Sequence, residues 1–215
     1  MVITLLLACG TMNAARPLEP GQHAVGATFG GAVVDAGFVT TPLPNLVVEG
    51  RSGLTTFHDR PFELSYGANL TGVAFGLAGV HVGGAWLAMD QDGRRPAVAL
   101  SERTHLYTNV FDTTKTDKQL MTLLQFEALA SWDTDRALLY VGLADYLQPS
   151  NPMLTLSPIL GTEVHLGERW GLQLEARHLA INQNKDPLGT ITWVTWGPGA
   201  LSLTLGVNRT FGATR

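Results

Sequence analysis

Residues 201–208 have the sequence LSLTLGVN, in which leucine or valine alternates with serine, threonine, glycine or asparagine. Successive side chains of a β-strand point to opposite faces of a sheet, so this stretch predicts a strand with one apolar and one polar face. The same period of two recurs at residues 24–33, 46–51, 62–69, 124–131 and 172–177. With less regular runs at 77–89, 96–110, 137–147 and 154–166, the sequence predicts about ten strands.

The composition indicates where the apolar faces point. Charged residues make up 15% of the 215 residues, whereas a soluble domain carries about 25%. No segment approaches the roughly 18 apolar residues that a membrane-spanning helix needs. A closed barrel also satisfies its backbone polar groups inside lipid. We therefore predict an all-β fold: a closed, antiparallel, up-and-down transmembrane β-barrel of about ten strands. Eight or twelve strands remain alternatives because region 66–90 is ambiguous.

Short and long connections alternate along the chain. Residues 90–93, 133–136 and 167–169 are expected to form tight turns, whereas 35–44, 111–119, 148–153 and 181–199 are longer polar or proline-rich loops. This asymmetry is typical of membrane barrels, and it predicts both termini on the short-turn side. Aromatic girdles are expected at both ends. The short-turn girdle would contain Trp86, Trp132, Trp170 and Phe211, and the loop-side girdle Tyr107, Phe111, Tyr146, Trp193 and Trp196.

The end of the chain adds a family resemblance. Residues 199–211 form an amphipathic stretch that closes on Phe211, although Gly212 to Arg215 follow it. This resembles the C-terminal signal of bacterial outer-membrane proteins. Over residues 23–211 the pattern resembles small bacterial outer-membrane β-barrels, without pointing to a specific family. The resemblance implies the bacterial outer membrane as location, and outer-membrane lipids and the barrel-assembly machinery as partners.

The first residues are predicted to be a separate segment. An apolar run leads to Leu6-Leu7-Ala8-Cys9-Gly10, which resembles a bacterial lipobox and would make Cys9 a lipidation site. The positively charged start of a secretory signal is missing, so a buried apolar segment with an incidental thiol is the alternative. We assign residues 1–22 to this signal-like segment and a linker, and residues 23–215 to the barrel.

The alternation also predicts which charges face the lumen. A basic group on the lipid face at mid-membrane would cost about 2–4 kcal/mol, so the charged phase should point inward. About eight strands leave an interior that side chains just fill, and unpaired buried charges are costly. These residues are therefore expected to pair and plug the lumen, with a narrow conduit or small-ligand site as the alternative. The predicted network consists of Glu49, Arg51, Glu63, His81, Arg103, His105, Glu127, Glu163, Glu175 and Arg177.

The sequence contains no catalytic or cofactor motif. The single cysteine excludes an internal disulfide and a four-cysteine zinc site. The histidines lack a ligand spacing, so no metal and no cofactor are expected. No basic patch with interleaved aromatics occurs, which argues against nucleic acid as a partner. His178 resembles the histidine of outer-membrane lipid A deacylases, but Ala180 stands where those enzymes have serine.

Three functional hypotheses follow. We favour a non-enzymatic outer-membrane barrel with an envelope-structural, adhesion or narrow, porin-like conduit role. One alternative is an outer-membrane barrel enzyme acting on lipid or peptide. The other is a lipocalin-like soluble barrel binding an apolar ligand. No small-molecule ligand is specified, but Trp193 and Trp196 lie in a nineteen-residue stretch, 181–199, and long loops are often functional. We expect these two tryptophans to contact a partner, a glycan or the membrane surface, or to belong to a girdle.

Overall fold

The computed structural model describes residues 15–35, 40–42, 46–70, 77–109, 121–147, 149, 156–179 and 200–212. No described segment forms a helix that could cross a bilayer. The strands are β1 (His23–Asp35), β2 (Thr40–Pro42), β3 (Leu46–Phe57), β4 (Arg60–Asn69), β5 (Leu77–Met89), β6 (Ala97–Asn109), β7 (Met121–Asp133), β8 (Ala137–Leu147), β9 (Leu156–His165), β10 (Trp170–Leu179) and β11 (Ala200–Phe211).

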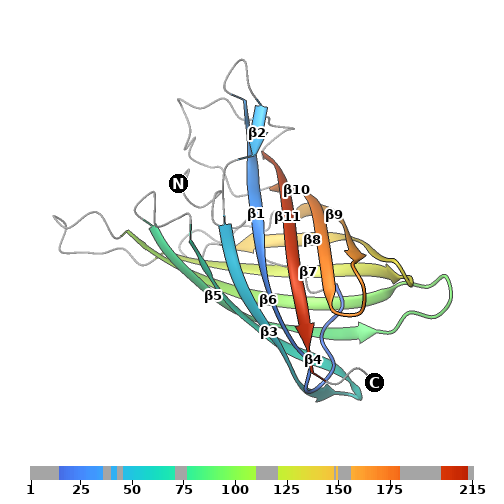
Figure 1. The fold of residues 1–215 in the computed structure, drawn as a ribbon. Helices are drawn as coiled ribbons and strands as arrows, with labels where there is room; N and C mark the ends of the chain where they lie inside the picture. Colours follow the sequence, from blue (N-terminus) through green and yellow to red (C-terminus); the bar gives the residue numbers. More distant parts are fainter. Residues whose placement is uncertain are drawn as a thin grey trace.

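Ten of these strands form a closed antiparallel barrel (Figure 1). From β3 to β11 each strand pairs with the next, and β1 pairs with both β3 and β11. The short β2 pairs only with the end of β1, at Val33–Asp35. The predicted barrel of ten strands is therefore confirmed, and eight or twelve strands are excluded for the described barrel.

The stretch that predicts the fold, residues 201–208, lies in the strand that closes the barrel. In β11, Leu205 pairs with Leu174 of β10 on one side and with Phe29 of β1 on the other. The β1–β11 ladder runs from the pair His23–Phe211 to the pair Ala32–Ser202. Because this ladder joins the first and last barrel strands, it removes the sheet edges that an open sheet would leave unpaired.

The two faces of the strands have opposite character. On β11, Leu203 and Leu205 are 38% and 49% exposed, whereas Ser202 and Thr204 are 1% and 6% exposed. The apolar face therefore points outward and the polar face into the barrel, as a barrel in lipid requires. We call the outward apolar surface the belt. Every barrel strand contributes to it a side chain that is 40–62% exposed: Val25, Val48, Tyr66, Val82, Leu100, Phe126, Val141, Leu160, Leu174 and Leu205.

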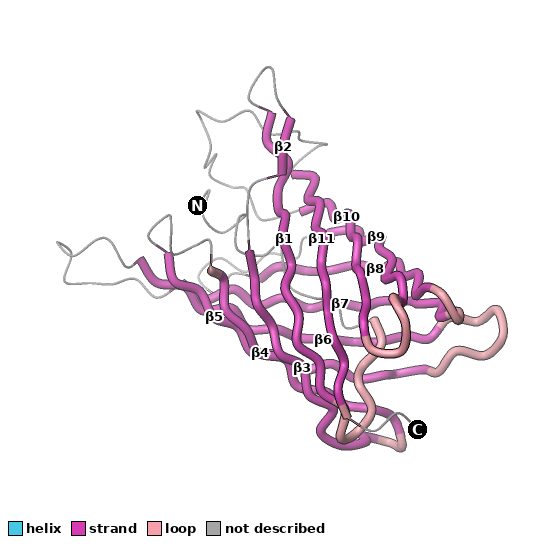
Figure 2. The backbone as a smooth tube through the Cα atoms, viewed as in Figure 1, coloured by secondary structure: helices cyan, strands magenta, loops and turns pink. Residues whose placement is uncertain are grey.

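The described turns gather at one end of the barrel (Figure 2). They connect β3 to β4, β5 to β6, β7 to β8 and β9 to β10. The first is a two-residue turn in which His58 and Asp59 have φ values of 51° and 60°. A tight hairpin turn of this kind needs positive φ at both central residues. The sequence does not predict this turn, because His58 and Asp59 stand where a tight hairpin turn usually has a glycine.

The aromatic residues match the predicted girdles at one end only. Trp170 and Phe211, at the short-turn end, are 46% and 37% exposed. At the loop end the prediction is wrong for Tyr107 and Tyr146, which are 2% and 1% exposed and lie inside the barrel. Tyr107 follows inward-facing His105 by two residues, so the strand period already gives it the inward phase. The other predicted members, Phe111, Trp193 and Trp196, lie outside the described residues.

Candidate functional site

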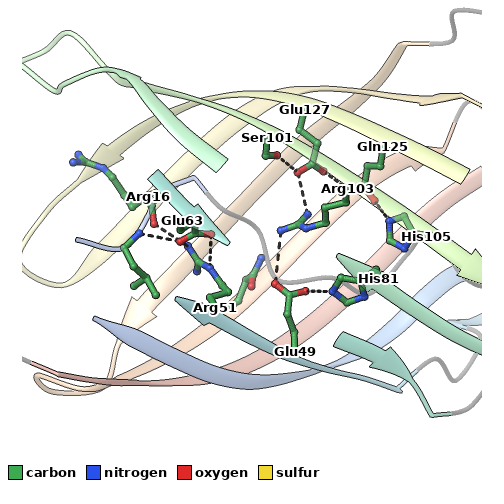
Figure 3. A network of polar contacts seen from close by, with 12 residues as sticks. Arg16, Glu49, Arg51, Glu63, His81, Ser101, Arg103, His105, Gln125 and Glu127 are labelled. Carbon is green, nitrogen blue, oxygen red and sulfur yellow. Dashed lines mark hydrogen bonds and ion pairs between the residues drawn. The ribbon is translucent and has the colours of Figure 1, made fainter. Parts of the chain in front are cut away.

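The polar faces of the strands meet in the lumen. Of the ten residues predicted to form the lumen network, all except half-buried Glu163 are at most 6% exposed. Nine of them come from β3, β4, β5, β6, β7 and β10, and Glu163 comes from β9, where it accepts a hydrogen bond from Asn208 at 3.0 Å. Their contacts form two groups, a central cluster around Glu127 and a mouth cluster around Glu63. Figure 3 shows residues of both.

Glu127 is the centre of the central cluster. Its carboxylate lies 3.3 Å from Nη1 of Arg103 and 2.9 Å from Nη2 of Arg177. It also accepts hydrogen bonds from Gln125 at 2.7 Å and from Ser101 at 3.1 Å. Two guanidinium groups thus share one buried carboxylate, and its oxygens also accept hydrogen bonds from neutral donors. These additional hydrogen bonds offset the desolvation cost of burying the ion pairs.

A histidine pair extends this cluster towards β3. Arg103 lies 3.8 Å from Oε1 of Glu49, and Oε2 of Glu49 lies 3.0 Å from Nε2 of His81. His81 and His105 are direct cross-strand partners with ring centroids 5.4 Å apart. Nε2 of His105 lies 2.8 Å from the side-chain oxygen of Gln125. The contacts from Glu49 to Glu127 therefore run across the lumen through side chains alone (Figure 3).

The opposite side of the central cluster depends on two tyrosines. Arg177 is 2.8 Å from Glu175 and donates a hydrogen bond to the hydroxyl of Tyr146. The hydroxyl of Tyr140 donates to Glu175 at 3.0 Å and accepts from Gln173 at 2.8 Å. The sequence analysis missed both tyrosines and Gln173 as network members. The strand period indicates Gln173, because it lies two residues before Glu175 and therefore on the same inward face of β10.

Glycines make room for the lumen rings. Tyr140 is the cross-strand partner of Gly161, and His81 is the partner of Gly67. A Cβ atom at Gly161 would collide with the Tyr140 ring, and one at Gly67 with the His81 ring. The rings therefore lie across the glycines, and this close approach lets a ten-stranded barrel hold them in its interior.

The mouth cluster binds a segment of the chain that precedes the barrel. Arg51 forms a two-pronged ion pair with Glu63, with Nε–Oε1 and Nη2–Oε2 distances of 2.8 and 2.7 Å. Glu63 also accepts a hydrogen bond from the backbone N–H of Leu18 at 2.9 Å, and Arg51 donates to the carbonyl of Arg16 at 2.9 Å. The carbonyl of Ala15, itself 1% exposed, accepts from Ser131 at 3.2 Å.

We call residues 15–18 the strap. These residues were predicted to belong to a linker. No pattern in them indicates this contact, because it is made largely by backbone groups. Strands β3, β4 and β7 each contribute a side chain that holds the strap, so it lies across the short-turn mouth of the lumen. The lipidation prediction at Cys9 lies outside the described residues.

The carboxylate of Glu102 points outward, away from the lumen. Glu102 has the outward phase of Leu100 on β6 and is half-buried in a groove of about 570 Å³ on the belt. Its partner in the β5–β6 register is Gly84, and its Oε1 accepts a hydrogen bond from Thr104 at 2.8 Å. Glu102 was not among the predicted site residues, although inward-facing Arg103 beside it implies that Glu102 points outward.

The described site holds no metal-binding group. Within the described residues, no three His, Cys, Asp or Glu side chains lie together in a way that could hold a metal ion. The basic and acidic groups of the lumen are instead bonded to one another.

Comparison with known proteins gives structural similarity only. No family model matches the sequence, and no curated protein matches it. An outer membrane channel from Pseudomonas putida F1 is 11% identical with a TM-score of 0.47, over 94% of this chain and 99% of the channel. The translocator domain of the autotransporter NalP from Neisseria meningitidis is 11% identical with a TM-score of 0.42, over 90% of each chain. The attachment invasion locus protein Ail of Yersinia pestis is 9% identical with a TM-score of 0.31, over 89% of this chain and 99% of Ail.

All three are outer-membrane β-barrels. At these identities and TM-scores they assign neither a family nor a role to this chain, whose barrel geometry stands on its own strand pairing and burial.

Proposed function

We propose that this protein is a sealed, non-enzymatic β-barrel of the bacterial outer membrane that serves envelope structure or adhesion. The belt of exposed apolar side chains on a closed barrel supports a membrane location. A chain of this kind needs outer-membrane lipids around it and the barrel-assembly machinery to insert it, and we include both as partners in the proposal.

The observation that carries the proposal is the buried ion-pair network in the lumen. Arg103, Glu127 and Arg177 cross the interior at 1–4% exposure, and the strap lies over the mouth at the short-turn end. We infer that side chains bonded to one another in this way block the passage of a hydrated ion through the middle of the barrel. A sealed barrel presents its outer surface and its loops as the parts that interact with other molecules.

Current measurement in a planar lipid bilayer tests this proposal. The purified wild-type barrel should leave the conductance at the level of the lipid alone. A double variant, Arg103→Ala with Arg177→Ala, removes both guanidinium groups and leaves carboxylates that attract cations, so it should produce discrete current steps. Stable steps from the wild-type barrel would contradict the sealed lumen.

A narrow conduit is the second candidate, and one observation favours it. The lumen network consists of charged and hydrogen-bonding groups rather than apolar side chains, and Oε1 of Glu49 is buried without a hydrogen bond from any described residue. A wettable plug of this kind opens more readily than an apolar one. The conduit predicts small, stable current steps from the wild-type barrel in the same experiment.

The remaining alternatives differ in their predictions. A barrel enzyme predicts turnover of lipid A or phospholipid by the purified protein and loss of that turnover in His178→Ala, whereas a sealed barrel predicts no turnover. A lipocalin-like barrel needs its apolar face inside. That orientation is opposite to the burial of Ser202 and Thr204 and the exposure of Leu203 and Leu205.

A further inference from the structure

Arg209 is a cation on the outer surface of the barrel. It lies on β11 in the outward phase of Leu205 and Val207, and its register partners are Val25 of β1 and Trp170 of β10. It lies two residues before the end of β11, at the short-turn end of the barrel. This is the level at which the belt ends and the aromatic residues begin.

Two aromatic rings enclose its guanidinium group. The Cζ atom of Arg209 lies 5.2 Å from the ring centroid of Trp170 and 4.9 Å from that of Phe211. The Nε atom is buried and has no hydrogen-bond partner among the described residues. In the described part of the chain no carboxylate pairs with Arg209, whereas the lumen residues Arg51 and Arg177 are both ion-paired. The rings therefore hold a half-buried cation that has no carboxylate partner in the described part of the chain.

Trp170 differs from the other described tryptophans at this end. The indole N–H of Trp86 donates to the carbonyl of Phe57 at 3.0 Å, and that of Trp132 donates to the carbonyl of Arg94 at 3.0 Å. The indole N–H of Trp170 has no acceptor among the described residues. Trp170 and Arg209 are register partners, so the indole N–H and the guanidinium group lie close together on the outer surface.

We propose that Arg209, Trp170 and Phe211 form a binding site for the phosphate group of an anionic phospholipid in the membrane leaflet at the short-turn end. A planar guanidinium group donates two parallel hydrogen bonds to phosphate oxygens, and the indole N–H supplies a third donor to a phosphate or ester oxygen. The exposed side chains of Val25 and Val207, 51% and 40% exposed, provide an apolar surface for the acyl chains.

The charge of the site selects the lipid. Because no acidic side chain of the described chain neutralises Arg209, the bound lipid must supply the anion. A phosphatidylglycerol head group carries a net negative charge, whereas phosphatidylcholine carries its own cation next to the phosphate. The site therefore favours the former. This inference requires a barrel in lipid but does not depend on whether the lumen is sealed.

Native mass spectrometry of the folded protein in detergent micelles tests the site. The protein is titrated with phosphatidylglycerol or with phosphatidylcholine of the same acyl chains, and the dissociation constant of the first bound lipid is compared. Wild-type protein should bind phosphatidylglycerol about tenfold more tightly. Arg209→Gln should abolish this preference, and Trp170→Phe, which keeps a ring but removes the N–H, should weaken phosphatidylglycerol binding about threefold.

Arg94→Gln is the matched control, because Arg94 is an exposed cation at the same end of the barrel, on the β5–β6 turn. This variant should keep the wild-type preference. Equal affinity of the wild-type protein for the two lipids would overturn the proposal, and this comparison needs no variant to fold. So would an equal loss of preference in Arg94→Gln and Arg209→Gln, because that result indicates general attraction between a basic surface and an anionic lipid.

Discussion

Glu127→Gln should destabilise the barrel strongly, although it changes one oxygen into an NH₂ group. The carboxylate of Glu127 lies 3.3 Å from Arg103 and 2.9 Å from Arg177, and it is 4% exposed. The variant keeps the size of the side chain but leaves two buried guanidinium groups without the anion between them. Removing one partner of a buried ion pair costs about 3–5 kcal/mol, and we expect a loss in this range.

Glu102→Gln is the matched control for this prediction. The chemical change is the same, but Glu102 faces outward on the belt, bonded to Thr104. A carboxylate on the lipid face is itself unfavourable, by less than the roughly 2–4 kcal/mol of a basic group at mid-membrane. Neutralising it should therefore leave the barrel equally stable or make it more stable.

The assay is equilibrium urea unfolding of the protein in phospholipid vesicles, followed by tryptophan fluorescence, with the free energy of unfolding from linear extrapolation. The unboiled variants should first migrate as compact species on a gel. Equal free energies of unfolding for the two variants, or a larger loss for Glu102→Gln, would refute the inward placement of Glu127 and the outward placement of Glu102.

Three further predictions concern other parts of the barrel. Gly161→Val should lower the free energy of unfolding by about 1–3 kcal/mol, because the valine side chain overlaps the Tyr140 ring. In unfolding experiments the additional change Tyr140→Ala should recover part of this stability. No recovery would show that the ring is not the cause. Leu205→Arg should cost about 2–4 kcal/mol by placing a cation in the belt, and unchanged stability in vesicles would place this residue outside lipid. Arg51→Ala should free the strap, because it removes the hydrogen bond to the Arg16 carbonyl and the ion pair with Glu63. A protease added at the short-turn side should therefore cut the strap faster than in the wild-type protein. An equal rate of cleavage would mean that the mouth cluster does not hold the strap.

The architecture could be predicted because it depends on a pattern with a single period. In residues 201–208 each side chain is assigned to one face by its position alone, and the low solubility of charge in lipid then decides which face points inward. The same reasoning led to Arg103, Glu127 and Arg177 as lumen residues. This prediction needs no knowledge of individual contacts, because every strand of a closed barrel has one face towards the lumen and one face towards the lipid.

What could not be predicted depends on contacts across the lumen. The strap is held largely through backbone carbonyl and N–H groups of residues 15–18, and these groups are the same in every sequence. Tyr107 and Tyr146 were assigned to a girdle because tyrosine is common at both membrane interfaces and strand interiors. The strand period gives Tyr107 the inward phase of His105. For Tyr146 the neighbouring Asp145 suggests the opposite phase, because this charged residue itself faces outward, in register with exposed Phe126.

The central claim is a barrel with an apolar outside in lipid and a sealed polar inside, and neighbouring residues on β10 test both parts together. Gln173 is 2% exposed and Leu174 is 55% exposed. Each is replaced by cysteine in a Cys9→Ser background, and the folded proteins in vesicles are treated with a charged, water-soluble maleimide or with a membrane-soluble one. Leu174→Cys should react only with the membrane-soluble reagent, and Gln173→Cys with neither. Labelling of Gln173→Cys by the charged reagent would show an open, water-filled lumen, and its labelling of Leu174→Cys would show that the belt does not face lipid.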